Sequence, residues 1–186
     1  MKRNIWAIIP ARCGSKGIKE KNIKLLNKKP LFSYTITSAI KSKIFNKVLV
    51  LTDSNKFAKI AKKYGAEIPF LRPKNISNDN STDNELYEFL IKFLNKKKII
   101  PPDFFAHLSP TVPIRLNNVI KRGVEYFFIK KKMFESMRSV SEMTQTSYKT
   151  MRIINGKLCS IIKKDFDLNK LNKPRQSYQK TYIPNG

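Results

Sequence analysis

Between residues 11 and 22, the chain carries a segment whose residue types suit the binding of phosphate groups. It reads Ala-Arg-Cys-Gly-Ser-Lys-Gly-Ile-Lys-Glu-Lys-Asn. Its residues include two glycines, Gly14 and Gly17, the hydroxyl of Ser15, and the cations Arg12, Lys16 and Lys21. Glycines let backbone N–H groups approach phosphate oxygens, and the cations would neutralise charge that develops on a reacting phosphate. A lysine-rich surface loop without a ligand has a similar composition, so composition alone leaves both interpretations open.

The spacing of this segment differs from two common phosphate-binding motifs. No Gly-Lys-Ser/Thr ends it, as a P-loop requires, and the positions of Arg12, Gly14 and Gly17 do not match the dinucleotide turn G-x-G-x-x-G. The sequence therefore predicts neither a P-loop nor a dinucleotide site.

The elements around the segment indicate an α/β fold. Residues 5–9 form an apolar run that stops at Pro10, as a buried parallel strand does, and the segment follows directly. Further strands are predicted over 47–52, 67–71 and 103–108, and helices from residues 30, 54 and 82 and over 117–132. Alternation of this kind predicts a mainly parallel sheet in a Rossmann-like, three-layer α/β/α arrangement, which binds ligands at the carboxyl ends of its strands.

After residue 134, the alternation of strands and helices gives way to short predicted strands. Short strands are predicted at 139–141 and 151–154, and Asn155-Gly156 is a strong hairpin signal. We therefore predict a nucleotide-binding α/β domain over 1–134 and a β-rich arm over 135–186.

The net charge of +25 in 186 residues would normally suggest a nucleic acid or another polyanion as partner. Only 8 of the 38 cations are arginines, however, and the charge is spread over both halves of the chain. Because no arginine-rich face or basic tail is present, we expect solvated lysines and no nucleic-acid partner.

The cysteine and apolar patterns bear on location. Cys13 and Cys159 form neither a disulfide framework nor a metal cluster, and no apolar run is long enough for a signal peptide or a membrane span. We expect a soluble cytoplasmic protein without a membrane partner. Cys13 is interpreted as a small spacer, His107 as a packed residue of a buried strand, and Asp53 as either a helix N-cap or a support near the ligand.

The phosphate-binding segment belongs to a longer series of motifs. It extends to Ile8-Ile9-Pro10-Ala11-Arg12-x-Gly14-Ser15-Lys16-Gly17-Ile18-x-x-Lys21-Asn22. Five motifs follow it in order: Leu51-Thr52-Asp53-Ser54, Arg72-Pro73, Ser77-x-Asp79-x-x-Ser81, Ser109-Pro110-Thr111-x-Pro113-Ile114-Arg115, and Lys173-Pro174-Arg175-Gln176 leading to Pro184-Asn185-Gly186. Together they resemble the cytidylyltransferases that make CMP-activated sugar acids. Segments 138–143 and 147–150 are most similar to the branch for sialic and legionaminic acids.

The resemblance implies transfer of CMP from CTP to a nonulosonic acid, such as N-acetylneuraminate or a legionaminate, with pyrophosphate released, Mg²⁺ assisting, and surface glycan synthesis as the purpose. It implies catalytic roles for Arg12 and Lys21. The implied nucleotide-binding residues are Ala11, Arg12, Ser15, Lys16, Lys21, Asn22, Arg72, Ser81 and Ser109. The implied sugar-acid residues are Lys149, Arg175 and Gln176. Arms of the family cross a dimer, so we expect a homodimer, with Lys149 and Arg175 serving either their own site or the partner's.

Two departures from the family pattern shape the expectations. Ser109 stands where this branch usually has a glutamine, so base selectivity is open. The family chain also continues past Pro-Asn-Gly into a strand and a helix with two acidic metal ligands, whereas this sequence stops at Gly186. The hypothesis from sequence is a shortened form or the product of an interrupted gene, with impaired activity. An impaired homologue that only binds nucleotide or a partner is the alternative function.

Overall fold

The computed structural model describes residues 3–15, 17–115, 118–161 and 174–185, and the chain divides into two compact units. The first unit ends at Met137 and the second begins at Arg138. The strands of the first unit are β1 (Ile5–Pro10), β2 (Leu25–Leu26), β3 (Lys29–Pro30), β4 (Lys47–Leu51) and β5 (Phe104–His107). Its helices are α1 (Leu31–Lys41), α2 (Asn55–Lys63), α3 (Asp83–Lys96) and α4 (Val119–Lys130), with 3₁₀ turns η1 (Lys21–Ile23) and η2 (Lys74–Ile76). Among the described residues, no helix combines the length and apolar character that crossing a membrane requires.

A parallel sheet with strand order β4-β1-β5 forms the centre of the first unit. In its register, Ile8 of β1 lies opposite Leu49 of β4 on one side and His107 of β5 on the other. Because both faces of β1 are covered, its residues are apolar without alternation and almost fully buried. The predicted strands at 5–9 and 47–52 and their parallel pairing are confirmed.

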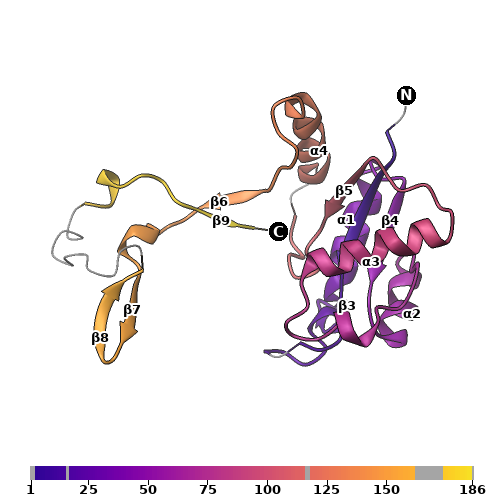
Figure 1. The fold of residues 1–186 in the computed structure, drawn as a ribbon, viewed down its shortest axis with the longest axis horizontal. Helices are drawn as coiled ribbons and strands as arrows, with labels where there is room; N and C mark the ends of the chain where they lie inside the picture. The colour runs from indigo at the N-terminus through magenta and orange to yellow at the C-terminus, as the bar shows by residue number, and fades with distance from the viewer. Residues whose placement is uncertain (1–2, 16, 116–117, 162–173, 186) are drawn as a thin grey trace. The chain divides into compact units, whose positions relative to one another are not determined.

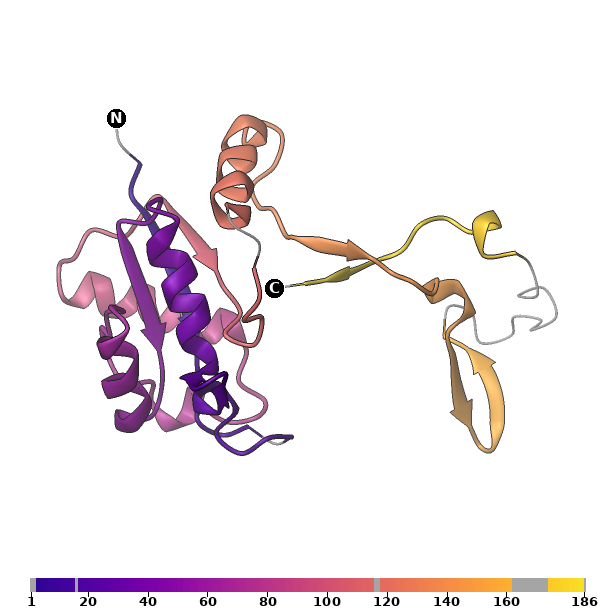
Figure 2. The ribbon, with the colours of Figure 1, turned by 180° about the vertical axis from the view of Figure 1, so that it is seen from behind.

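Helices cover both faces of this sheet, as Figures 1 and 2 show from opposite sides. On one face, Phe32 of α1 and Phe57 of α2 pack with Ile9 of β1 in one apolar cluster. On the other face, α3 places Leu86, Leu90 and Leu94 against Ile8, Trp6 and Leu49. The predicted three-layer α/β/α fold is therefore confirmed.

Local signals begin helices α2 and α3 at the predicted places. Ser54 caps α2 by accepting a hydrogen bond from the N–H of Phe57 at 3.4 Å, and Gly65, with φ +90°, follows its end. Thr82 and Glu85 form a reciprocal capping box at the start of α3.

Two predictions about strands need correction. Residues 67–71 make only isolated bridges, Leu49 to Glu67 and Thr52 to Leu71, because Pro69 between them has no N–H for a ladder. The strand with His107 is not buried: β5 pairs only with β1 among the described residues, and the His107 side chain is 39% exposed. His107 contacts the Tyr87 hydroxyl through Nδ1, so it packs on α3 at the open edge of the sheet.

The second unit consists of antiparallel strand pairs with little core. Its strands are β6 (Val140–Glu142), β7 (Met151–Ile154), β8 (Lys157–Ser160) and β9 (Tyr182–Pro184), with 3₁₀ turns η3 (Ser147–Lys149) and η5 (Arg175–Ser177). β6 pairs with β9, and β7 pairs with β8 through the predicted Asn155-Gly156 hairpin, where φ is +49° and +74°. Only Thr146 and Ser160 are buried among the described residues of this unit.

Candidate functional site

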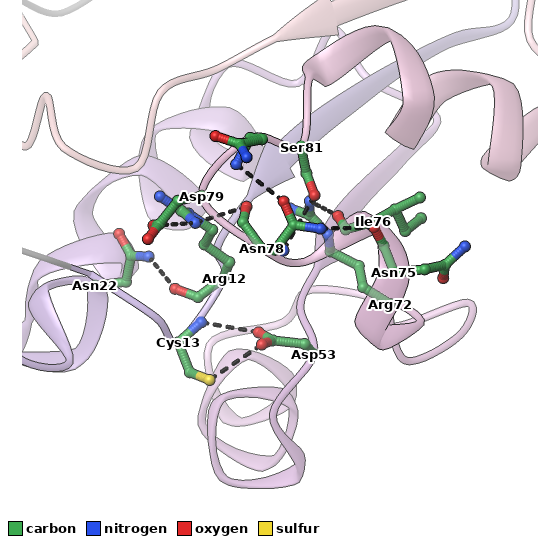
Figure 3. Close-up of polar contacts among 11 residues, drawn as sticks. Arg12, Cys13, Asn22, Asp53, Arg72, Asn75, Ile76, Asn78, Asp79 and Ser81 are labelled. Carbon is green, nitrogen blue, oxygen red and sulfur yellow. Dashed lines mark hydrogen bonds and ion pairs between the residues drawn. The ribbon is translucent and has the colours of Figure 1, made fainter.

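The segment 11–22 lies at the carboxyl end of the sheet, where it meets the segment 72–82 and the residues that follow β4 (Figure 3). The segment leaves β1 at Ala11, which is fully buried and donates its N–H to the Leu51 carbonyl at 2.9 Å. The loop therefore starts from a fixed point in the core, as ligand loops of parallel α/β sheets do.

Arg12 connects this loop to the segment 72–82. Its Nη1 donates to the Asn78 carbonyl at 2.8 Å and to Asp79 Oδ1 at 2.9 Å. The two side chains of the ion pair are 33% and 41% exposed, a degree of exposure at which such a pair contributes about 0–1 kcal/mol. An anionic ligand can therefore compete with Asp79 for this guanidinium.

Cys13 is bound twice by Asp53, which follows β4. Its N–H donates to Oδ1 at 2.8 Å, and its thiol donates to Oδ2 at 3.1 Å. The hydrogen bond to Asp53, together with burial and the carboxylate charge, raises the pKa of the Cys13 thiol. A thiol that stays protonated is a poor nucleophile, which favours the spacer interpretation. Ser54, not Asp53, caps α2, so of the two roles left open for Asp53 the N-cap is wrong.

Asn22 closes the loop from its other end. The side chain is 5% exposed, and its Nδ2 donates to the Arg12 carbonyl at 3.0 Å. Its Oδ1 is buried without a hydrogen-bond partner among the described residues. Glu20 adds a third attachment through its ion pair with Lys56 of α2 at 2.7 Å. An unsatisfied buried acceptor is costly in a folded protein, which makes Asn22 a candidate ligand contact.

Between these attachments, the backbone is accessible. Among the described residues other than its chain neighbours, a Cβ placed on Gly14 or on Gly17 would meet no atom within 4 Å. Ser15 is partly exposed, and its N–H donates to the Cys13 carbonyl at 3.0 Å. Lys21 opens the turn η1 and is partly exposed. Lys16, which the sequence assigns to the nucleotide, lies outside the described residues.

Arg72 is the most buried cation of the site, with 7% exposure. Its N–H donates to the Thr52 carbonyl at 2.8 Å and its Nη2 to the Ile76 carbonyl at 2.5 Å, whereas its Nε has no partner among the described residues. Burial lowers the pKa of Arg72, the direction expected for a cation removed from water. Ser81 Oγ accepts from the Asn78 N–H at 3.0 Å, so this hydroxyl shapes the turn that receives Arg12.

Ser109, two residues beyond the end of β5, is held by residues that the sequence did not assign to the site. Its carbonyl accepts from Thr35 Oγ1 of α1 at 3.1 Å and from Arg115 Nη2 at 2.9 Å. Arg115 Nη1 also donates to Thr35 Oγ1 at 2.8 Å and to the Val112 carbonyl. The Ser109 hydroxyl lies 3.0 Å from that of Thr111. The sequence motif that runs from Ser109 to Arg115 could have pointed to Arg115 as a residue of this loop. Its contact with Thr35 could not be predicted, because it depends on how the chain folds.

The described residues do not fit a metal ion. Nowhere in the described part of the chain do three or more His, Cys, Asp or Glu side chains lie close enough to hold one. Near the loop, both oxygens of Asp53 bind Cys13, and Asp79 pairs with Arg12. We therefore assign no catalytic step to the Mg²⁺ that the family resemblance implies.

The residues expected to bind the sugar acid all belong to the second unit. Lys149 ends η3, and its Nζ lies 5.6 Å from the centre of the Tyr178 ring. Gln176 lines a cavity of about 300 Å³ together with residues that include Thr146 and Tyr178. Arg175 opens η5, and its side chain lies outside the described residues. The structure thus gathers the expected nucleotide residues in one unit and the expected sugar-acid residues in the other.

A sequence model of a family described as cytidylyltransferase matches residues 6–101. The chain is 36% identical to the N-acylneuraminate cytidylyltransferase of Escherichia coli O18:K1:H7 (strain RS218 / NMEC), over 100% of this chain and 42% of that protein. It is also 36% identical to the CMP-N,N'-diacetyllegionaminic acid synthase of Legionella pneumophila subsp. pneumophila (strain Philadelphia 1), over 74% of this chain and 59% of that one.

Among solved structures, the fold is similar to that of CMP:2-keto-3-deoxy-manno-octonic acid synthetase complexed with CTP. The TM-score is 0.53 at 19% identity, over 75% of this chain and 51% of the other. At this identity the likeness concerns the fold alone. The chain spans between about two fifths and three fifths of the length of the two relatives that it matches.

Proposed function

The chain belongs to the cytidylyltransferase family, and from this premise we propose that it transfers CMP from CTP to a nonulosonic acid and releases pyrophosphate. The observation that carries the proposal is the loop at the end of β1. It is attached at the Arg12 carbonyl, at Cys13 and at Glu20, and it leaves the backbone at its two glycines open. The class of the acceptor is taken from two relatives at 36% identity, whose names specify an N-acylneuraminate and N,N'-diacetyllegionaminic acid.

In the proposed reaction, the anomeric hydroxyl oxygen of the sugar acid forms a bond to the α-phosphorus of CTP. The bond from that phosphorus to the oxygen bridging to the β-phosphate breaks, its electron pair leaves with pyrophosphate, and the hydroxyl proton passes to solvent. Negative charge accumulates on the leaving pyrophosphate, so cations fixed in place before the reaction stabilise the transition state. Arg12 and Lys21 supply these charges, and Ser15 and Lys16 add donors to the phosphates.

The other nucleotide contacts follow from position. Asn22, at the end of the loop, offers its buried Oδ1 to a hydroxyl of the nucleotide. Arg72 and Ser81 border the cytidine from the segment 72–82, and Ser109 borders it from the loop after β5. Because the serine side chain is short, Ser109 contacts the base either through a bridging water molecule or together with its neighbour Thr111, whose hydroxyl it contacts.

For the sugar acid, we assign Lys149, Arg175 and Gln176, since a carboxylate substrate calls for cations and donors. The assembly we propose is a homodimer. In the second unit, apolar side chains such as Ile153 (73% exposed) and Leu158 (58%) face solvent, and a second copy would cover them. Light scattering at two concentrations tests the dimer. Synthesis of a CMP-activated acid for surface glycans, in the CTP-containing cytoplasm, is the biological role that the proposal implies.

Calorimetric titration tests the nucleotide part of the proposal. We expect CTP to bind and GTP and ATP to bind at least tenfold more weakly. Lys21→Met is expected to lower CTP affinity by about tenfold or more, the effect of one lost charge-assisted contact. Lys63→Met, at the opposite end of α2 from the loop, is the matched control and leaves affinity unchanged. Equal binding of all three nucleotides, or no binding by the folded chain, contradicts the proposal.

Pyrophosphate release tests the transfer step. The assay contains CTP, Mg²⁺ and either N-acetylneuraminate or N,N'-diacetyllegionaminate, because relatives of this family use a divalent ion. Release that depends on the sugar acid supports the reaction. CTP binding without release under every condition instead supports the alternative of an impaired homologue that only binds nucleotide.

A further inference from the structure

We infer that Asp53 is a positioning residue that fixes the phosphate-binding loop through Cys13. The inference rests on the proposed function, since it concerns the same nucleotide site. In a loop with several cations and two glycines, the backbone has many accessible conformations, and holding one of them in advance lowers the entropy cost of ligand binding.

The carboxylate of Asp53 is mounted on rigid structure. Thr52, which precedes it, is fully buried, and its carbonyl accepts the Arg72 N–H at 2.8 Å. Thr52 Oγ1 accepts the Ser54 N–H at 3.2 Å, and Ser54 caps α2. Because the backbone is fixed on both sides, the carboxylate has a defined position from which to hold another segment.

What Asp53 holds is one peptide group of the loop. Its Oδ1 accepts the Cys13 N–H at 2.8 Å, while Asn22 Nδ2 donates to the Arg12 carbonyl at 3.0 Å (Figure 3). This N–H and this carbonyl belong to the same peptide plane between Arg12 and Cys13. With both ends bound, the plane cannot rotate, so the direction of Arg12 and the start of the glycine backbone are set together.

The second contact fixes the carboxylate itself. Oδ2 accepts the Cys13 thiol at 3.1 Å, so both oxygens face one residue. A carboxylate that faced the triphosphate would repel it, whereas this one is turned toward Cys13 and lies just before the N-terminus of α2, where negative charge is favoured. Its place beside a phosphate site is therefore explained by the loop that it holds.

The test compares variants by their affinity for three probes: CTP, inorganic tripolyphosphate and cytidine. Asp53→Ala is expected to lower the affinity for CTP and for tripolyphosphate by about tenfold or more, because a charge-assisted hydrogen bond to the loop backbone is lost. Cytidine, measured by ligand-observed NMR, carries no phosphate and is expected to bind unchanged. Asp53→Asn keeps the shape of the side chain and one acceptor oxygen, and its affinity for CTP and tripolyphosphate is expected to fall severalfold. This variant serves as the test if Asp53→Ala does not fold.

Cys13→Ser is the conservative control. Its hydroxyl still donates to Oδ2, so affinities are expected within about twofold of the wild type, whereas Cys13→Ala removes that contact and gives a loss between those of Cys13→Ser and Asp53→Ala. All titrations are repeated in EDTA, where the losses are expected to persist.

Three results overturn the inference: equal CTP affinity in Asp53→Ala and wild type, an equal loss for cytidine, or a loss that appears only with Mg²⁺, which would make Asp53 a metal ligand. Failure of the proposed function is distinct. In that case the wild type does not prefer CTP, yet tripolyphosphate still binds in an Asp53-dependent way. A wild-type protein that binds neither CTP nor tripolyphosphate contradicts both the inference and the proposed function.

Discussion

Arg115 is expected to stabilise the fold and the Ser109 loop together. Its guanidinium joins the carbonyls of Ser109 and Val112 to the hydroxyl of Thr35, a fully buried residue of α1. Burial lowers the pKa of Arg115, in line with a cation partly removed from water. In the variant Arg115→Met, the side chain keeps an apolar stem and loses every one of these donors.

The magnitude follows from which partners are left unsatisfied. The Ser109 carbonyl keeps its bond from Thr35 Oγ1 at 3.1 Å, so the variant leaves one carbonyl, that of Val112, and one hydroxyl acceptor uncompensated. A lost hydrogen bond to a charged group costs about 1.5–3 kcal/mol, and the effects of neighbours do not add fully, so we expect about 2–3 kcal/mol in the free energy of unfolding. In a chain of 186 residues this lowers Tm by about 4–12 °C.

Thermal unfolding followed by circular dichroism measures this shift. Arg122→Met, an exposed position on α4, is the matched control and leaves Tm within about 2 °C. Arg115→Lys retains the positive charge but not the several N–H donors of the guanidinium, and its Tm is expected to lie between those of Arg115→Met and Arg122→Met. We also expect Arg115→Met to raise the KM for CTP, since Ser109 is no longer held. A Tm equal to that of the control would refute the reasoning.

Three further predictions concern single contacts. Asp79→Asn removes the exposed competitor for Arg12, so CTP affinity measured by calorimetry should rise by up to about fivefold, and a fall would contradict the competition. Asp53→Asn removes the carboxylate whose hydrogen bond and charge raise the pKa of the Cys13 thiol, so iodoacetamide should modify Cys13 faster at pH 8 by peptide mass spectrometry; an unchanged rate would count against that cause. Gly156→Ala strains a left-handed position, at about 1 kcal/mol, and should speed hydrogen exchange of the β7–β8 amides about fivefold, unlike a substitution at a neighbouring exposed position.

Much of the fold could be predicted because its signals are local. The apolar run of β1, the cap at Ser54 and the capping box at Thr82 each act within a few residues. The strand predicted at 67–71 failed on a local signal as well, since Pro69 lacks the N–H that a ladder needs.

The candidate site was less predictable because its contacts join distant segments. Arg12 meets Asp79 across 67 positions, Cys13 meets Asp53 across 40, and Arg115 meets Thr35 across 80. Residue types and motif order identified Arg12 as a ligand contact and Cys13 as a spacer, whereas neither Arg115 nor Thr35 was assigned to the site. In each pair, which residue meets which depends on how the layers pack. The same reason explains His107: a run of apolar residues does not reveal that its strand lies at the edge of the sheet.

The acidic residues, not the excess of lysine, organise this site. The loop's own cations repel one another in a chain of charge +25, so it needs attachments to keep one conformation. Among the described residues, three carboxylates fix it: Asp79 binds Arg12, Asp53 binds Cys13, and Glu20 of the loop binds Lys56. Asp79 pairs with a loop cation directly, whereas Asp53 binds backbone and thiol, and Glu20 uses a helix lysine. Of these three carboxylates, only Asp79 pairs with a cation of the loop, so the backbone is held with little of the loop's positive charge used. This is the condition for binding a polyanion such as CTP without a large ordering cost.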